Sequence, residues 1–136
     1  MTLHTIQIQT SDWHDLIDIT PQVRALIKET NLEDGMCFIF VPHSTAGLTI
    51  NSYLDPDTAK DLNSEINRLV PTRIDFSHIR DTPTDAAGHI KTSLIGTDLA
   101  LIVSNGDFTF GRSQAILFWE FDGPRTRTIQ VKFIKG

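Results

Sequence analysis

Hydrophobic and polar residues follow two different spacings along the chain, and each spacing predicts a different kind of element. A period of two, or a short continuous apolar run, predicts strands at residues 3–9, 13–19, 36–41, 99–103, 114–121 and 126–134. A spacing of three to four predicts a helix that Thr20 caps and that Pro21 opens. A second helix starts at Asp55-Pro56 and ends at Pro71.

Short turns connect several of these elements. Asn105-Gly106 is typical of a two-residue hairpin. The segment Asp122-Gly123-Pro124-Arg125 predicts a second hairpin between the last two strands, in which the turn positions Arg125. About seven strands with two or three helices predict an α+β fold, a mainly antiparallel β-sandwich with the helices packed against it. The length of 136 residues fits a single domain over residues 1–136.

The polar stretch from His43 to Asn51 directly follows the apolar strand at residues 36–41. If this stretch is extended, its residues divide between two faces. The polar face then carries His43, Thr45, Thr49 and Asn51, and the apolar face carries Ala46, Leu48 and Ile50. One face resembles core and the other resembles a site. The alternative is a strand edge whose polar residues are simply solvated.

A second polar cluster lies on a predicted short helix between a Thr84 cap and Gly96. Asp85, His89 and Ser93 recur every four residues and therefore share one stripe, while Ala86, Ile90 and Leu94 form an inward stripe beside it. A carboxylate one turn before a histidine can fix the tautomer of a metal-binding imidazole. The alternative is an exposed Asp–His pair with little effect on stability.

These motifs carry a family resemblance. The stretch His43–Asn51, the segment His89–Gly96 and the closing Gln114 with Glu120–Arg125 resemble, in order and spacing, the signatures of the YjbQ-type family, also called secondary thiamine-phosphate synthases. The resemblance covers residues 2–133 and implies a homotrimer with weak thiamine-phosphate synthase activity. It adds Gln114 and Glu120 to Asp85 as candidate catalytic residues. The chain departs from the family pattern at residues 79–83 and 111–113.

Three histidines are candidate metal ligands, namely His43, His78 and His89. Three imidazoles with an open coordination position are typical of a catalytic divalent-metal site, and these ligands favour zinc. His43 and His89 should then converge, although 46 residues separate them in the sequence. We expect His4 and His14 to lie at the surface.

Hydroxyl and cationic side chains next to these histidines predict a phosphate-sized anion site. Ser44 and Thr45 follow His43, Lys91 follows His89, and Arg125 is a further candidate. Thr49, Asn51 and Ser93 complete the candidate substrate-binding residues. A surface position is the ordinary alternative for each of them, and for Lys91 above all.

Composition narrows the classes of partner. The net charge of −5 argues against a general nucleic-acid or anionic-membrane binder, and no apolar run is long enough to span a membrane. The chain starts without a signal-peptide pattern, and its single cysteine, Cys37, lies in an apolar run. We therefore expect a cytoplasmic protein with no internal disulfide.

The leading hypothesis is a metal-dependent enzyme that acts on a small phosphorylated molecule, resembling weak thiamine-phosphate synthases. A second hypothesis is a non-catalytic module that binds a metal and a phosphorylated ligand. A third is a trimeric structural protein whose polar clusters only satisfy a subunit interface. Metal analysis separates the third hypothesis from the other two.

Overall fold

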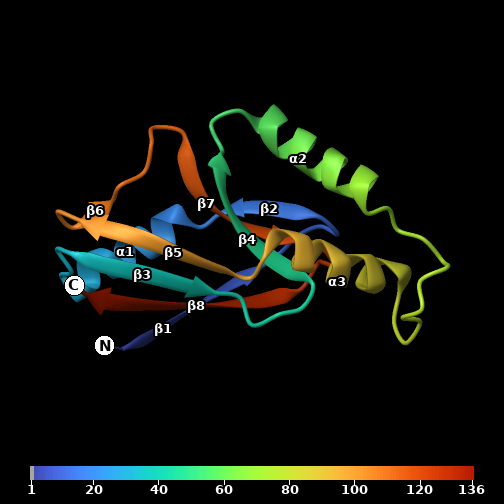
Figure 1. Cartoon of the computed structure of the whole chain (residues 1–136), viewed down its shortest axis with the longest axis horizontal. Coiled ribbons are helices and arrows are strands. Elements are labelled where there is room, and N and C mark those ends of the chain that lie inside the picture. The colour runs from blue at the N-terminus through green and yellow to red at the C-terminus, as the bar shows by residue number, and fades with distance from the viewer. Residues whose placement is uncertain (1) are drawn as a thin grey trace.

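Two antiparallel sheets form the body of the protein in the computed structural model, which describes residues 2–136 (Figure 1). The larger sheet has the order β1 (Leu3–Gln9), β8 (Thr126–Lys135), β3 (Gly35–Phe40), β5 (Asp98–Ser104) and β6 (Asp107–Phe108). The smaller sheet has the order β2 (Asp15–Asp18), β7 (Gln114–Glu120) and β4 (Ala46–Ser52). The predicted α+β class is confirmed. Residues 2–136 form eight strands, where about seven were predicted. The additional strand is the two-residue β6, which the Asn105-Gly106 turn pairs with β5.

Strand β7 explains how the core is divided. Ile116 and Phe118 belong to the main core with residues of β3, β4 and β8, whereas Leu117 and Trp119 belong to a second cluster with Ile66. Successive side chains of a strand point to opposite faces, so β7 is covered on both sides. This double burial accounts for its continuous apolar sequence, in contrast to the alternating pattern of β1.

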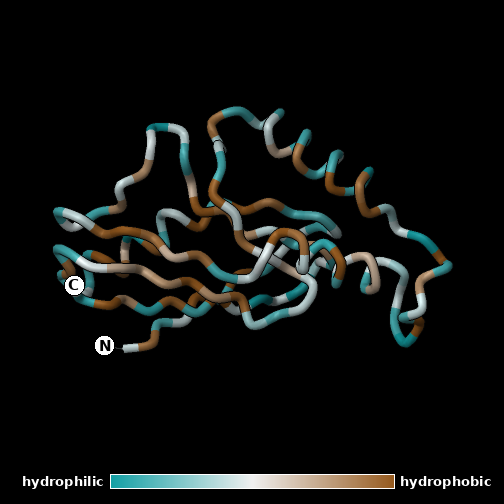
Figure 2. Tube along the Cα trace, in the orientation of Figure 1, coloured by the Kyte–Doolittle hydropathy of each residue, from teal (hydrophilic) through white to brown (hydrophobic). Residues whose placement is uncertain are grey.

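Three helices complete the fold, α1 (Thr20–Thr30), α2 (Pro56–Leu69) and α3 (Pro83–Ile95). Each has a proline in its first turn, where the missing N–H is harmless. Helix α2 lies along one edge of the molecule, and its trace alternates between hydrophilic and hydrophobic positions (Figures 1 and 2). Among residues 2–136, no helix combines the length and apolar character needed to cross a membrane.

The predicted hairpin between the last two strands is wrong. Strand β7 pairs with β2 and β4, whereas β8 pairs with β1 and β3 in the other sheet. The turn between them instead hydrogen-bonds to the segment before β2, because the Gly123 N–H donates to the Trp13 carbonyl (3.0 Å) and the Arg125 N–H donates to Thr10 Oγ1 (2.8 Å). The chain therefore changes sheets at this turn.

The predicted inward stripe of α3 is confirmed at Ala86 and wrong at Ile90 and Leu94. The helix begins two residues early, since the cap is Thr82, whose hydroxyl accepts the Asp85 N–H, and not Thr84. Its buried residues are Ala86, Ala87, Gly88, Lys91 and Thr92, whereas Ile90 is 40% and Leu94 is 62% exposed. Small residues allow close approach: a Cβ on Gly88 would lie 3.2 Å from the Thr45 side chain. Close packing against the Thr45 segment thus decides which face turns inward.

Candidate functional site

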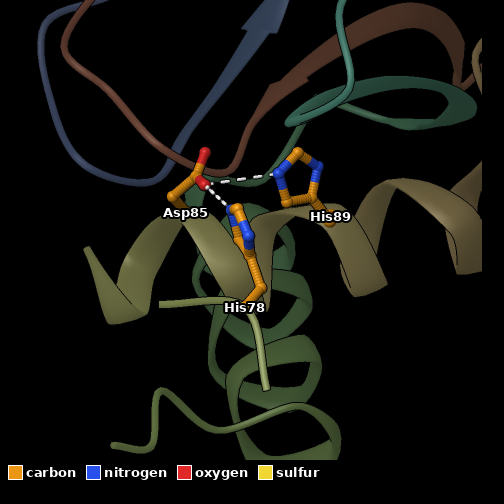
Figure 3. Close-up of side chains that lie close together, drawn as sticks. All are labelled: His78, Asp85 and His89. Atoms are coloured by element: carbon orange, nitrogen blue, oxygen red, sulfur yellow. Dashed lines mark hydrogen bonds and ion pairs between the residues drawn. The ribbon is translucent and has the colours of Figure 1, made fainter. Parts of the chain in front are cut away.

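Two histidines and one carboxylate meet at the amino-terminal half of α3 (Figure 3). Asp85 Oδ2 lies 2.6 Å from His78 Nε2 and 3.3 Å from His89 Nε2, and the three ligand atoms lie within 4.8 Å of one another. Asp85 and His89 are neighbours because they are one helical turn apart. His78 comes from the segment between α2 and α3. The Asp85 side chain is 13% exposed and each histidine side chain is 40% exposed, so the cluster is accessible from solvent.

The two ring nitrogens of His89 both face oxygen atoms. His89 Nδ1 lies 3.2 Å from the Ser44 carbonyl, which can only accept, so this nitrogen carries a proton. His89 Nε2 faces the Asp85 carboxylate. In a neutral ring with Nδ1 protonated, two lone pairs would oppose each other there. A cation between the two groups would relieve this repulsion, because both lone pairs could bind to it.

Asp85 is held as a carboxylate. Burial alone would raise its pKa, but the hydrogen bond from His78 and the charges of His89 and His78 outweigh burial, and the pKa is lowered. An ionised carboxylate flanked by two imidazoles is a set of ligands that divalent transition metals use. The arrangement can hold a proton or bind such a metal.

His43, the third predicted imidazole ligand, lies apart from this group. Its Nε2 accepts the Thr128 N–H at 2.9 Å, and burial, reinforced by the charge of Arg127, lowers its pKa. His43 and His89 nevertheless line one polar pocket of about 460 Å³. Two of the three predicted imidazoles thus meet Asp85, and the third faces the neighbouring pocket.

Glu120, predicted as catalytic, lies in a closed ion-pair cluster. Arg127 donates to both of its oxygens, and the Thr10 hydroxyl and two backbone N–H groups occupy the remaining positions. Arg127 Nη2 also donates to Thr45 Oγ1 (2.9 Å). Thr45 is 5% exposed and Glu120 is fully buried. Neither side chain can reach a ligand in solvent, so their role here is structural.

Lys91 is the clearest departure from the predicted anion site. It is fully buried, and its Nζ donates to Asn67 Oδ1 (2.6 Å) and His14 Nε2 (2.9 Å), 5.0 Å from the Trp13 ring. Burial lowers the pKa of Lys91 to about 8 and that of His14 to about 4. His14 itself is half-buried and not at the surface as expected. Lys91 is two residues from His89 and so points away from it.

The sequence did not predict the hydrogen-bond network around Lys91, because this network joins the amino-terminal segment to α2. Asn63 Oδ1 accepts from both His14 Nδ1 (3.1 Å) and Trp119 Nε1 (2.7 Å). Asn63 and Asn67 are one turn apart on α2, and this spacing was the only signal in the sequence. The polar face of α2 thus turns partly inward, where amides satisfy the buried donors.

The remaining predicted residues are dispersed. Arg125 donates to the Asp122 carboxylate (2.8 Å), which raises its pKa, and Gln114 accepts the Gly111 N–H (2.8 Å). Asn51 accepts the Ser52 N–H (2.7 Å), and Thr49 lines an apolar groove beside α2. Ser44 and Ser93 do line the polar pocket with His43 and His89. The structure therefore does not gather the predicted phosphate donors into one site.

Comparisons with known proteins identify relatives over the whole fold. The family model described as "UPF0047 protein YjbQ-like" matches residues 4–136. A UPF0047 protein of Methanocaldococcus jannaschii is 41% identical over 97% of this chain and 94% of its own length. The UPF0047 protein YugU of Bacillus subtilis is 40% identical over 97% of this chain and 98% of its own length.

Solved structures agree with these matches. A protein of the YjbQ/UPF0047 family from Clostridium acetobutylicum, described as uncharacterized, superposes with a TM-score of 0.91 at 38% identity and covers 96% of this chain and 99% of its own. A YbjQ-like protein of unknown function from Sulfolobus solfataricus gives a TM-score of 0.93 at 27% identity, over 99% of this chain and 97% of its own.

These names correct the leading hypothesis. The relatives are uncharacterised proteins, and none of the names describes a metal-dependent enzyme that resembles thiamine-phosphate synthases. The expectation of that activity is therefore wrong. The geometry gives the physical reason for abandoning a phosphorylated substrate, because Lys91 and Arg125 are already bound within the protein.

Proposed function

Because this chain belongs to the family of YjbQ-like UPF0047 proteins, whose names assign no activity, we propose a function from the site alone: the protein binds a divalent transition metal, zinc in the first instance. The ligands are His78, Asp85 and His89. Imidazole nitrogen and carboxylate oxygen suit zinc, and nickel or cobalt can occupy the same ligands. Three protein ligands leave at least one coordination position for water or a second ligand.

The contact between His89 and Asp85 carries this proposal. Ligand atoms of a tetrahedral zinc lie about 3.3 Å apart, given zinc–ligand bonds of about 2 Å. His89 Nε2 and Asp85 Oδ2 are separated by 3.3 Å. The Ser44 carbonyl holds the proton on Nδ1, which leaves the Nε2 lone pair directed at the site. His78 needs to retreat by less than about 1 Å, and its exposed position permits that.

Elemental analysis of the purified protein tests the proposal. We expect zinc in a one-to-one ratio with the chain, and its loss in His78→Ala, His89→Ala and Asp85→Asn, each with cooperative unfolding retained. His4→Ala is the matched control, because His4 lies on β1 outside the cluster, and it should keep its zinc. Wild-type protein that takes up no zinc, nickel or cobalt from a saturating solution would refute the proposal.

The family resemblance also implied a homotrimer, and the composition led us to expect a cytoplasmic protein; we retain both as parts of the proposal. Exposed apolar side chains support contact between copies: Leu69 is 60% and Leu94 is 62% exposed. Leu69 lines an apolar groove of about 490 Å³ together with Ile95 and Trp119, and Leu94 directly precedes Ile95 in α3. Sedimentation equilibrium measures the assembly directly. A monomer at all concentrations would contradict this part and leave metal binding unaffected.

A further inference from the structure

A polar pocket adjoins the proposed metal site and shares His89 with it. Its volume is about 460 Å³, and it lies between the loop before β4, the end of α3 and the start of β5. The lining consists of two imidazoles, four hydroxyl side chains, one carboxylate and Gly96, from His43, Ser44, His89, Thr92, Ser93, Thr97 and Asp98. A pocket rich in hydroxyls differs from the usual apolar pocket and calls for a polar ligand.

The hydrogen bonds already made in this pocket show what it has left to offer. His43 Nε2 accepts the Thr128 N–H, so the neutral ring carries its proton on Nδ1 as a donor. The Ser93 hydroxyl donates its proton to the His89 carbonyl and keeps its lone pairs as acceptors. The Asp98 carboxylate only accepts, and it is exposed at the start of β5. The pocket therefore offers both a donor and acceptors, which is the combination that a hydroxyl group can use because it donates and accepts.

Charge argues against a phosphate group as the natural occupant. No lysine or arginine lines this pocket within residues 2–136. Lys91 is bound to Asn67 and His14, Arg125 to Asp122, and Arg127 to Glu120. With zinc bound, its two positive charges are offset by Asp85 and Asp98. The site as a whole is then close to neutral, and a dianion would bring charge that no side chain compensates.

We propose that this pocket binds a small neutral polyhydroxylated compound beside the metal. Asp98 accepts from the hydroxyls of the ligand, His43 Nδ1 donates to one of them, and the open metal position takes a further oxygen. This inference rests on the proposed metal binding, since the metal supplies both the charge balance and one contact. It replaces the predicted phosphorylated ligand with a neutral one.

Zinc-loaded protein titrated with D-ribose, and separately with inorganic phosphate, tests the inference by amide chemical shifts. We expect D-ribose to shift the signals of Ser44, Ser93 and Thr97 in a saturable way, and phosphate to bind at least about tenfold more weakly. Asp98→Asn should weaken D-ribose binding by about tenfold or more, because the charged acceptor becomes a neutral amide oxygen and one of its two acceptor atoms is replaced by a donor. The same substitution should strengthen phosphate binding, since it removes a repelling charge.

The control is Asp34→Asn, an exposed carboxylate before β3 and outside the pocket, which should change neither titration. Zinc content measured on the same samples separates the two proposals. Protein that holds zinc but shows no D-ribose shifts, or that binds phosphate more tightly than D-ribose, overturns the inference and leaves metal binding standing. Equal D-ribose affinity in wild type and Asp98→Asn also overturns it. Protein without zinc refutes the proposed function first.

Discussion

Two carboxylates at the same end of the protein have opposite surroundings. Glu120 is fully buried, and Arg127, the Thr10 hydroxyl and two backbone N–H groups donate to it. Asp85 is 13% exposed, and its partners are two imidazoles whose side chains are each 40% exposed. Both residues lie in motifs that the sequence marked as candidate chemistry. Only the structure shows that one carboxylate is saturated and the other is free to exchange a partner.

The two carboxylates differ in the groups that compensate for their loss of hydration. A buried carboxylate cannot bind a ligand once a donor occupies every lone pair. Removing such a carboxylate leaves its cationic partner unpaired in the protein interior. Asp85 keeps its charge through imidazoles that a cation can take over as ligands. The number of donors around each carboxylate, and not its residue type, therefore distinguishes Asp85 as the candidate ligand from Glu120.

Glu120→Gln should have the largest effect on stability. The substitution keeps the shape but leaves the Arg127 guanidinium buried without a countercharge, so we expect a loss of about 3–5 kcal/mol in the free energy of unfolding. Urea unfolding measures it. Zinc content of the folded variant should remain unchanged. A loss below about 1 kcal/mol would place the Glu120–Arg127 pair among solvated surface pairs and remove the contrast with Asp85.

Lys91 should give a smaller effect that depends on pH. Burial holds its folded pKa at about 8, below the ordinary 10.5, so the unfolded chain binds the proton more tightly. Stability from this group is therefore lowest below pH 8 and rises as the pH increases from 8 toward 10.5. We expect wild type to gain up to about 1 kcal/mol relative to Lys91→Met between pH 8 and pH 9, measured by urea unfolding.

Two controls isolate the Lys91 effect. Burial raises the pKa of Cys37 to about 12, which lowers stability above pH 9, but both proteins share this term and it cancels in the difference. Lys60→Met changes a lysine whose side chain is 79% exposed on α2 and should show no such pH dependence. The same pH profile for Lys91→Met and wild type would show that Lys91 is hydrated in solution.

Asp85→Asn should have the smallest effect on stability, below about 1 kcal/mol, because the pairs it removes are half-exposed. The same variant should lose at least about tenfold in zinc affinity, as a ligand and the partner of both imidazoles disappears. Competition with a chelator measures the affinity. Asp85→Asn that unfolds as readily as Glu120→Gln would make both carboxylates structural.

The sequence predicted the elements well where the signal was local. Prolines placed α1 and α2, and Asp55 caps α2 as predicted, whereas the N-cap of α1 is Ile19 and the Thr20 hydroxyl instead accepts the Ile116 N–H. Asn105-Gly106 placed the β5–β6 hairpin, and the four-residue spacing paired Asp85 with His89. These features depend on neighbours within one turn, and local preferences decide them. They account for part of the site as well as for most of the fold.

Long-range arrangement was beyond such reasoning. The 122–125 turn resembles a hairpin, yet its backbone hydrogen bonds go to Thr10 and Trp13, more than a hundred residues away. Lys91 is a surface residue by default, and its burial depends on amides of α2 and on His14. His43 was a candidate metal ligand because it opens the polar stretch that follows an apolar strand, whereas a backbone N–H from β8 occupies its Nε2.

The double burial of β7 limits how the length of this chain can change. Along β7, Ile116, Phe118 and Glu120 face one way, and Leu117 and Trp119 face the other. Deleting a single residue before Glu120 would exchange the two faces and move the carboxylate away from Arg127 toward the apolar cluster of α2. The 70–82 segment, largely exposed and outside both sheets, has no such register. Insertions and deletions over evolutionary time should therefore be found in the 70–82 segment more often than in β7, within the limit that His78 still reaches Asp85.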